Sequence, residues 1–552
     1  MKQRMKGITG KLARPAERFL FPAVLLIYPL LWADQGIELA DSMYSLTNFR
    51  FFPQLEGTWM VATYLANVMG WLLMKLPFGG TLLGISFYTR LMISAMALLS
   101  YYFLKGKMPA SAAFLGEILA ISFFWCPSTI LYNYLTYFLF LLGSILLYRG
   151  LIWERKGLLL GAGVCLGLNG MVRLPNLAET ALILAVFYYG RLANQKMDEV
   201  WKNVGVCVAG FLTGFLAAFA LVCIQYGPGA WFGMFTSLAG YSATDESYSP
   251  FSMVTSVLKA YEGTLIWAML LGSCILAGWI FFRLLPPRFH RAGKAVYCIC
   301  IPVLLRLFWG RGMFTFTYYN YRSMYEWGML LLYLILLSCL FVMADAGRFR
   351  RDRLLALMVL LSVAVTPLGS NNGTMPSLNN LFLAAPFALG ALGQGYVRYG
   401  RRPLFFPAVA ITVTVLAVTV VQGIGFRARF AFGDGIYGEK RDAKVDNSDI
   451  LIGMRTKVWN AENLSGLLDF MENQEEAADS LLRLADQDRR GQEPSSAASL
   501  ITFGNAPGLH YLLDLAPALT HSWPDLDTYP SDQMKVELDE AALLSQRPLI
   551  IL

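Results

Sequence analysis

About thirteen apolar stretches, separated by short polar loops, fill the chain up to residue 424, and each is roughly as long as a helix must be to cross a bilayer. Hydrophobic residues make up 56% of the chain and charged residues only 15%, which is less charge than a soluble globular domain carries. The sequence therefore predicts an α-helical polytopic membrane protein, with residues 1–424 as its transmembrane part.

The basic residues of the loops sort to one side of the predicted membrane. With a cytoplasmic N-terminus, nearly all of them lie on the inner side, in the loops 1–19, 105–110, 148–157, 191–203, 283–294, 345–353 and 396–403. The positive-inside rule describes this arrangement, so the net charge of +8 indicates contact with membrane lipid and no nucleic-acid partner. The outer loops hold most of the loop carboxylates and Asn residues. We therefore expect any chemistry on the outer face.

The segment 55–76 decides the topology, because it is long enough to span the membrane. If it did, every later basic loop would lie outside, against the positive-inside rule. We therefore predict an interfacial helix within a first outer loop at 33–83, anchored by Trp59, Tyr64 and Trp71.

From residue 425 onward the chain becomes polar and acidic. An odd number of crossings places this tail, residues 425–552, outside the membrane as a small soluble α/β domain. Its end has a β-like run at 500–503, a turn at 504–508, a helix from Leu509 and a second β-like run at 548–552.

Glu38 and Asp41 are the candidate catalytic residues, because they follow the first span directly. They would share one face if this stretch were helical. At the partly dehydrated mouth of a bundle, a carboxylate could act as a general base or hold a divalent metal such as Mg or Mn. Two solvated, helix-capping acids would show the same spacing, so both interpretations stay open.

Further polar residues of the outer loops indicate an anionic, polar ligand. Arginine binds phosphate through two parallel hydrogen bonds, although arginines near span ends also snorkel to the headgroups. Asn residues suit a sugar or phosphate, although an Asn-Gly turn needs them too. These candidate substrate-binding residues are Arg173, Asn176, Asp245, Glu246, Tyr248, Arg311, Arg322, Asn371 and Asn372.

The predicted organisation resembles that of the GT-C class of membrane glycosyltransferases. The shared features are a long first outer loop with acidic residues, an interfacial helix in that loop, an odd number of spans and an outward tail. Protein O-mannosyltransferases, aminoarabinose transferases and oligosaccharyltransferases belong to this class. Four segments are similar to a bacterial branch of it, namely GIELADSMYSLTNFRFF, GMVRLPN, PLGSNNG and GNAPGLHYLLDLAPALTHSWPDLDTYP. The catalytic acid of the class corresponds to Asp41 or Glu38. The adjacent Asp-Glu pair of several members is absent, which leaves that choice open.

The resemblance implies transfer of a sugar from a polyprenyl phosphate or pyrophosphate to an acceptor glycan, lipid or protein outside a bacterial plasma membrane. A carboxylate would deprotonate the acceptor for an inverting attack, with or without a metal. The alternative is a transporter or flippase of a lipid-linked sugar or another polar solute, for which the intramembrane Glu117 would be suited. Hydropathy shows no symmetry between halves to support it.

Overall fold

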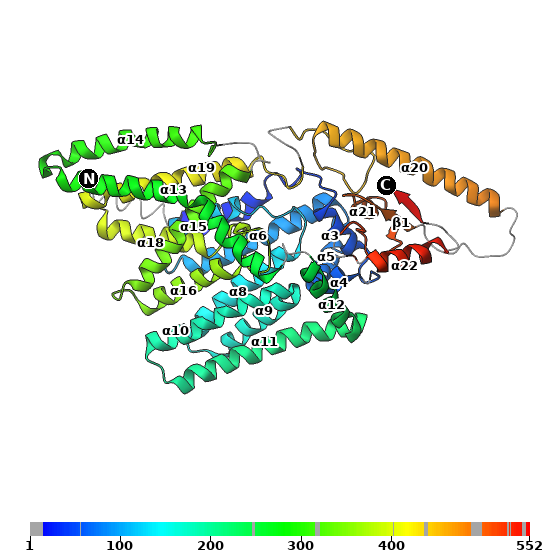
Figure 1. Cartoon of the computed structure of the whole chain (residues 1–552), viewed down its shortest axis with the longest axis horizontal. Helices are drawn as coiled ribbons and strands as arrows, with labels where there is room; N and C mark the ends of the chain where they lie inside the picture. The colour runs from blue at the N-terminus through cyan, green and yellow to red at the C-terminus, as the bar shows by residue number, and fades with distance from the viewer. Residues whose placement is uncertain are drawn as a thin grey trace.

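The computed structural model describes residues 15–55, 57–244, 249–314, 321–400, 402–434, 440–486, 499–526, 529, 531–543 and 548–551. Within these residues the protein is a bundle of helices with a smaller C-terminal part at one end. Figure 1 shows that part, with α20, α21, α22 and β1, beside the N-terminal helix α3 and away from most of the bundle.

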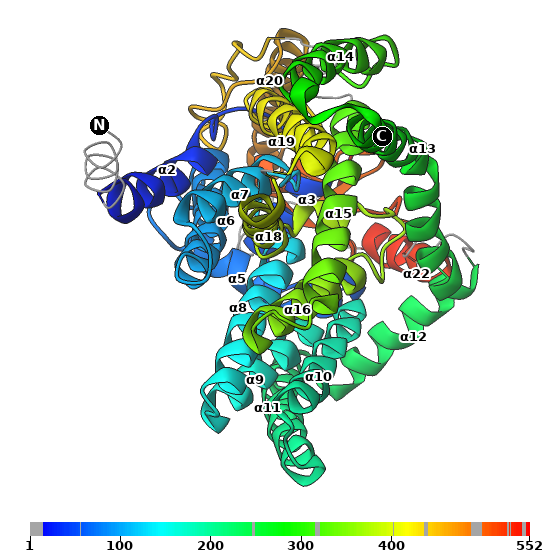
Figure 2. The same cartoon turned by 90° about the vertical axis from the view of Figure 1, so that its left-hand side faces the viewer.

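Seven helices of the described chain are long and apolar enough to cross a membrane. They are α6 (Leu82–Leu104), α8 (Tyr132–Ile152), α11 (Met197–Tyr226), α13 (Pro250–Leu284), α14 (His290–Gly310), α15 (Tyr321–Ala344) and α19 (Phe406–Arg427). They support the prediction of a polytopic membrane protein. Figure 2 shows α13 and α14 at the edge of the bundle and α9 beside α11.

Other apolar segments fold as shorter helices, so the expected thirteen spans are not confirmed. These helices are α2 (Phe21–Ile27), α7 (Ala110–Ser122), α9 (Lys156–Val172), η3 (Leu174–Ile183), α10 (Leu184–Ala193), α16 (Arg350–Val365) and α18 (Ala384–Tyr399). The physical reason is that an apolar segment need not form one continuous helix where the surrounding protein provides hydrogen-bond partners for its backbone N–H and C=O groups.

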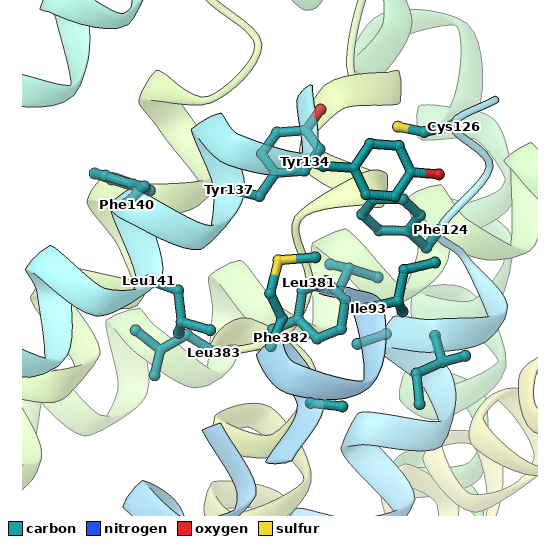
Figure 3. Packing of buried hydrophobic residues seen from close by; sticks show 14 of the residues in the cluster. Ile93, Phe124, Cys126, Tyr134, Tyr137, Phe140, Leu141, Leu381, Phe382 and Leu383 are labelled. Carbon is teal, nitrogen blue, oxygen red and sulfur yellow. The ribbon is translucent and has the colours of Figure 1, made fainter. Parts of the chain in front are cut away.

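Residues 123–131, which follow α7, are the clearest example of such a break. Their backbone is not helical, yet it is buried among neighbouring helices. Arg427 of α19 donates to the Phe124 carbonyl at 2.6 Å, and the Asn379 side chain accepts from the Trp125 N–H at 2.9 Å. Figure 3 shows the surrounding core, where the Phe124 ring packs against Tyr134 and Phe382. Glu117 of α7 is fully buried in the bundle.

The segment 55–76 forms two short helices, α4 (Thr58–Ala62) and α5 (Tyr64–Met74), which break at Thr63. At about 1.5 Å per residue neither helix is long enough to cross a bilayer. That the segment lies at the membrane surface stays a prediction. Trp59 and Tyr64 pack in a local apolar cluster with residues of α11 and α12 (Pro228–Thr244).

The C-terminal part contains a small parallel sheet in the order β2-β1-β3. Its elements are α20 (Val458–Asp486), β1 (Ser499–Thr502), α21 (Leu509–Leu512), β2 (Ala516–Pro517), α22 (Ser531–Ala542) and β3 (Leu549–Ile551). The predicted strands at 500–503 and 548–552 and the helix from Leu509 are thus confirmed within the described residues.

The tail packs directly onto residues 39–50, which include α3. Gly508 N donates to the Leu39 carbonyl at 3.1 Å, and Thr47 Oγ1 donates to the Pro507 carbonyl at 3.1 Å. Arg50 forms two hydrogen bonds with Asp514, at 2.7 and 2.6 Å. The tail therefore forms one wall of the space beside α3 (Asp41–Arg50).

Candidate active site

A cavity of about 570 Å³ lies where residues 41–67, the bundle and the tail meet. The residues around it come from segments far apart in the sequence. Its walls include Asp41, Tyr44, Ser45 and Asn48 of α3, Trp59 and Asn67 of the following helices, Trp125, Cys126, Tyr132 and Asn133 of the bundle, Asn372 and Asn379 near α17 (Met375–Asn379), and Phe432, Trp523 and Leu526 beyond α19.

Asp41 is the carboxylate of this cavity. It is the first residue of α3, and the spacing of Asp41, Ser45 and Asn48 places all three on one face of that helix. Among the described residues, none donates a hydrogen bond to the Asp41 carboxylate. Its side chain is exposed to the cavity but surrounded by protein, and this loss of hydration raises the pKa of the Asp41 carboxyl above its ordinary value.

Glu38 has a different position, because the helix begins only at Asp41 and the stretch before it is not helical. The two carboxylates therefore do not share a helical face. Glu38 accepts hydrogen bonds from the N–H groups of Ala40 and Ser42, at 2.8 and 2.7 Å, and so caps α3. Burial raises the pKa of Glu38, and hydrogen bonds from Ser42 offset part of this effect.

The chain after α19 holds this loop in place through Asp434, a residue that was not predicted from the sequence. Its buried carboxylate accepts hydrogen bonds from Ile37 N at 2.9 Å, Thr456 Oγ1 at 2.7 Å and Asn460 Nδ2 at 2.8 Å. The contact joins segments almost four hundred residues apart, for which the sequence offers no local signal.

Arg173 lies in a smaller polar cavity of about 60 Å³ that adjoins the first. The two cavities share Tyr132, Asn133, Asn372, Met375 and Asn379 as wall residues. The Arg173 guanidinium lies over the Tyr132 ring, 5.2 Å from its centroid. Its Nε atom is buried and has no hydrogen-bond partner among the described residues. Arg173 thus keeps donor capacity for an anion.

Asn176 fixes the turn that carries Arg173. Its buried side-chain amide donates to Thr136 Oγ1 at 2.8 Å and to the Asn169 carbonyl at 3.0 Å. Asn169 in turn bonds to Glu179, which is also buried. The Asn176 amide is therefore engaged within the protein, and the residue does not appear in either cavity wall of the described structure.

The remaining predicted binding residues differ in where they lie relative to the two cavities. Asn372 lines both cavities, whereas Asn371, half-buried beside it, lines neither within the described structure. Arg311 is exposed at the end of α14 and lines neither cavity within the described residues. Asp245, Glu246, Tyr248 and the side chain of Arg322 lie outside the described residues.

Several wall residues were not predicted from the sequence. Tyr44, Asn48, Asn67, Trp125, Asn379 and Trp523 line the cavity as well. Buried Asn residues within apolar segments, such as Asn67 and Asn379, were a usable signal, because an amide buried among apolar side chains needs a polar partner.

Among the described residues, no group of three or more His, Cys, Asp or Glu side chains could hold a metal ion. Asp41 is therefore the described cavity residue that could contribute a carboxylate ligand to a divalent cation.

Comparisons with known proteins give only distant similarity. No family model and no curated protein matches the chain. The chain is similar to the crystal structure of the Archaeoglobus fulgidus oligosaccharyltransferase in complex with Zn and sulfate, with a TM-score of 0.46 and 13% identity over 90% of this chain and 61% of that one. It is also similar to the archaeal oligosaccharyltransferase AglB from Archaeoglobus fulgidus in complex with an inhibitory peptide and a dolichol-phosphate, with a TM-score of 0.44 and 12% identity over 91% and 64%.

The chain thus spans less than two thirds of the length of either structure.

Proposed function

We propose that this protein is a membrane glycosyltransferase that moves a sugar from a polyprenyl-phosphate or polyprenyl-pyrophosphate donor to an acceptor outside a bacterial plasma membrane. One observation carries the proposal: an unpaired carboxylate, Asp41, and an arginine with free donors, Arg173, occupy two adjoining cavities that share a wall. The resemblance of the first outer loop to the GT-C class supports the same reaction.

The chemistry separates into two sites. The lipid chain of the donor stays in the bilayer while its phosphate meets Arg173, whose planar guanidinium can bind two phosphate oxygens. Asp41 accepts the proton of the acceptor hydroxyl, and the hydroxyl oxygen forms a bond to the anomeric carbon. The bond from that carbon to the phosphate oxygen breaks, and its electron pair leaves with the phosphate. Attack opposite the leaving group inverts the anomeric configuration.

Glu38 supports this site as a positioning residue. Its two hydrogen bonds fix the first turn of α3, and that turn carries Asp41. Gly433, at φ +66°, lies so close that a Cβ atom there would meet Glu38 Cγ at 2.1 Å. The tight packing holds the cap in one place.

Transfer by isolated membranes tests the proposal. Membranes with and without the protein are supplied with a panel of radiolabelled sugars on polyprenyl monophosphate and pyrophosphate. We expect label to leave the lipid only when the protein is present, and a parallel reaction with EDTA reports dependence on Mg or Mn. Absence of any label release, together with protein-dependent movement of intact donor across sealed vesicles, would support the transporter alternative, which the buried Glu117 favours.

A further inference from the structure

The tail contributes side chains to the cavity from the side opposite the bundle. Trp523 and Leu526 are wall residues, and the Trp523 ring lies 5.6 Å from the ring of Tyr44 on α3. Ser522 Oγ donates to Asn48 Oδ1 at 3.4 Å. The end of the cavity nearest the tail is thus built from α3 and the loop 520–526.

This loop is held firmly within the tail. Glu537 of α22 accepts hydrogen bonds from Thr520 N and Thr520 Oγ1, at 2.8 and 2.7 Å, and the His521 ring stacks on Tyr529 with centroids 4.1 Å apart. Burial opposes ionisation of Glu537, but hydrogen bonds from Tyr529 and Thr520 outweigh it and lower the pKa of this carboxyl. The loop therefore presents Trp523 in a fixed position.

The cavity is nearly neutral in charge. Apart from Asp41, no Asp, Glu, Lys or Arg side chain is found among its described wall residues. Its surface combines aromatic rings with side-chain amides, which both donate and accept hydrogen bonds. The Trp523 indole N–H is buried and has no hydrogen-bond partner among the described residues, so it is a donor left for a ligand.

Aromatic rings and amides together fit a sugar ring. Such a ring has an apolar face of C–H groups that packs against an aromatic side chain, and hydroxyl groups at its rim that bond to amides. A phosphorylated acceptor would bring negative charge beside Asp41, and no described wall residue of this cavity is a cation that could offset it. The wall therefore favours a neutral, polyhydroxylated acceptor.

The position of the tail loop distinguishes the acceptor from the donor sugar. The Arg173 cavity shares Tyr132, Asn133, Asn372 and Asn379 with the large cavity but does not include Trp523 or α3 residues. The donor phosphate would therefore enter on the bundle side. Asp41, which must receive the acceptor proton, lies on the same helix face as Asn48, next to the tail side.

We propose that the acceptor is a neutral saccharide that binds against Trp523 of the tail and Tyr44 and Asn48 of α3. This inference rests on the proposed function and adds to it the class of acceptor and the residues that recognise it. The tail is then part of the acceptor site.

The test uses the full-length protein in membranes with a labelled donor at saturation. The acceptors are neutral oligosaccharides, a Ser/Thr-containing peptide and an anionic phosphoglycan. We expect transfer to the neutral saccharides, with a KM that rises about tenfold in Trp523→Ala, the scale of a lost aromatic contact. Trp523→Phe should recover part of this loss, because the ring remains while the N–H is absent. Trp459→Ala, which removes an exposed tryptophan of α20, is the matched control and should leave KM unchanged.

Two results would overturn this inference while leaving the proposed function intact. One is transfer to the peptide or the phosphoglycan in preference to neutral saccharides. The other is an unchanged saccharide KM in Trp523→Ala. Donor binding, measured separately, should be equal in all three variants, which distinguishes acceptor recognition from disruption of the tail. If wild-type membranes release no sugar from any donor, even to water, the proposed function itself fails.

Discussion

Two carboxylates three residues apart have different roles because the backbone between them changes conformation. Glu38 precedes the helix and uses its oxygens to cap it, whereas Asp41 begins the helix and turns its carboxylate to the cavity. The sequence placed both acids near the site but could not separate them, since the spacing argument assumed helix through both. At this scale, local hydrogen bonding decides which carboxylate is free to react.

The role of Arg173 can be tested through its geometry. Arg173→Lys keeps the charge but loses the planar pair of donors, so donor binding should weaken, and Arg173→Ala should weaken it further. A hydrogen bond to a charged group contributes about 1.5–3 kcal/mol, so the alanine variant should lose roughly tenfold to a hundredfold in donor affinity. The measurement is binding of a labelled polyprenyl-phosphate sugar in detergent.

Arg311→Ala is the control for this series, because Arg311 is exposed and lines neither cavity within the described residues. It should bind donor like the wild type. Unchanged affinity in both Arg173 variants would instead assign Arg173 to anchoring at the membrane interface.

At the scale of elements, glycines allow α9, which leads to Arg173, to pack closely against α11. Cβ atoms built on Gly163 and Gly167 of α9 would meet backbone oxygens of α11 at 2.1 Å, and one on Gly214 of α11 would meet Val164 O at 2.4 Å. Small residues at such spacing let helix backbones approach within membranes. Because Arg173 directly follows α9, this contact also sets the height of the turn that carries Arg173.

A methyl group at one of these contacts should destabilise the bundle. In Gly167→Ala the new Cβ would lie 2.1 Å from Phe211 O, a backbone atom that cannot move aside easily. Overpacking of this kind costs about 1–3 kcal/mol, so the thermal midpoint in detergent should fall. Gly205→Ala on α11 is the matched control, because its Cβ would meet no atom within 4 Å and alanine favours helix. Equal midpoints for both variants would contradict the close contact.

For the whole molecule, the sequence was most informative about the fold class and least informative about how distant segments of the chain pack together. Alternating apolar and polar segments predicted a helical membrane bundle, and the strands around residues 501 and 550 were found where expected. The number of spans was not predictable, because buried irregular backbone such as residues 123–131 interrupts apolar stretches. The docking of the tail was not predictable either, since Thr47 and Pro507 are 460 residues apart and share no local pattern.

The predicted topology can be tested by labelling from outside the cell. In a cysteine-free background, single cysteines at Asn447 and Gly347 sit in exposed positions of the tail and of a predicted inner loop. An impermeant thiol reagent should label residue 447 and leave residue 347 unmodified until the cells are opened. The reverse pattern would place Asp41 and the tail on the cytoplasmic side, and the proposed donor could not reach them from the outer face.

The most direct test of the central claim is the transfer rate of Asp41→Asn with a saturating polyprenyl-linked sugar, measured across pH. The substitution keeps the size of the side chain but removes the base, so the rate should fall by about two to four orders of magnitude while donor binding persists. In the wild type, protonation of Asp41 should reduce the rate as pH falls through a pKa above the ordinary aspartate value, and the residual rate of the variant should lack this decline. Near wild-type transfer by Asp41→Asn would contradict the account. Loss of transfer in Glu38→Gln would then move the base to Glu38, and activity in both variants would direct the search to Asp245 and Glu246.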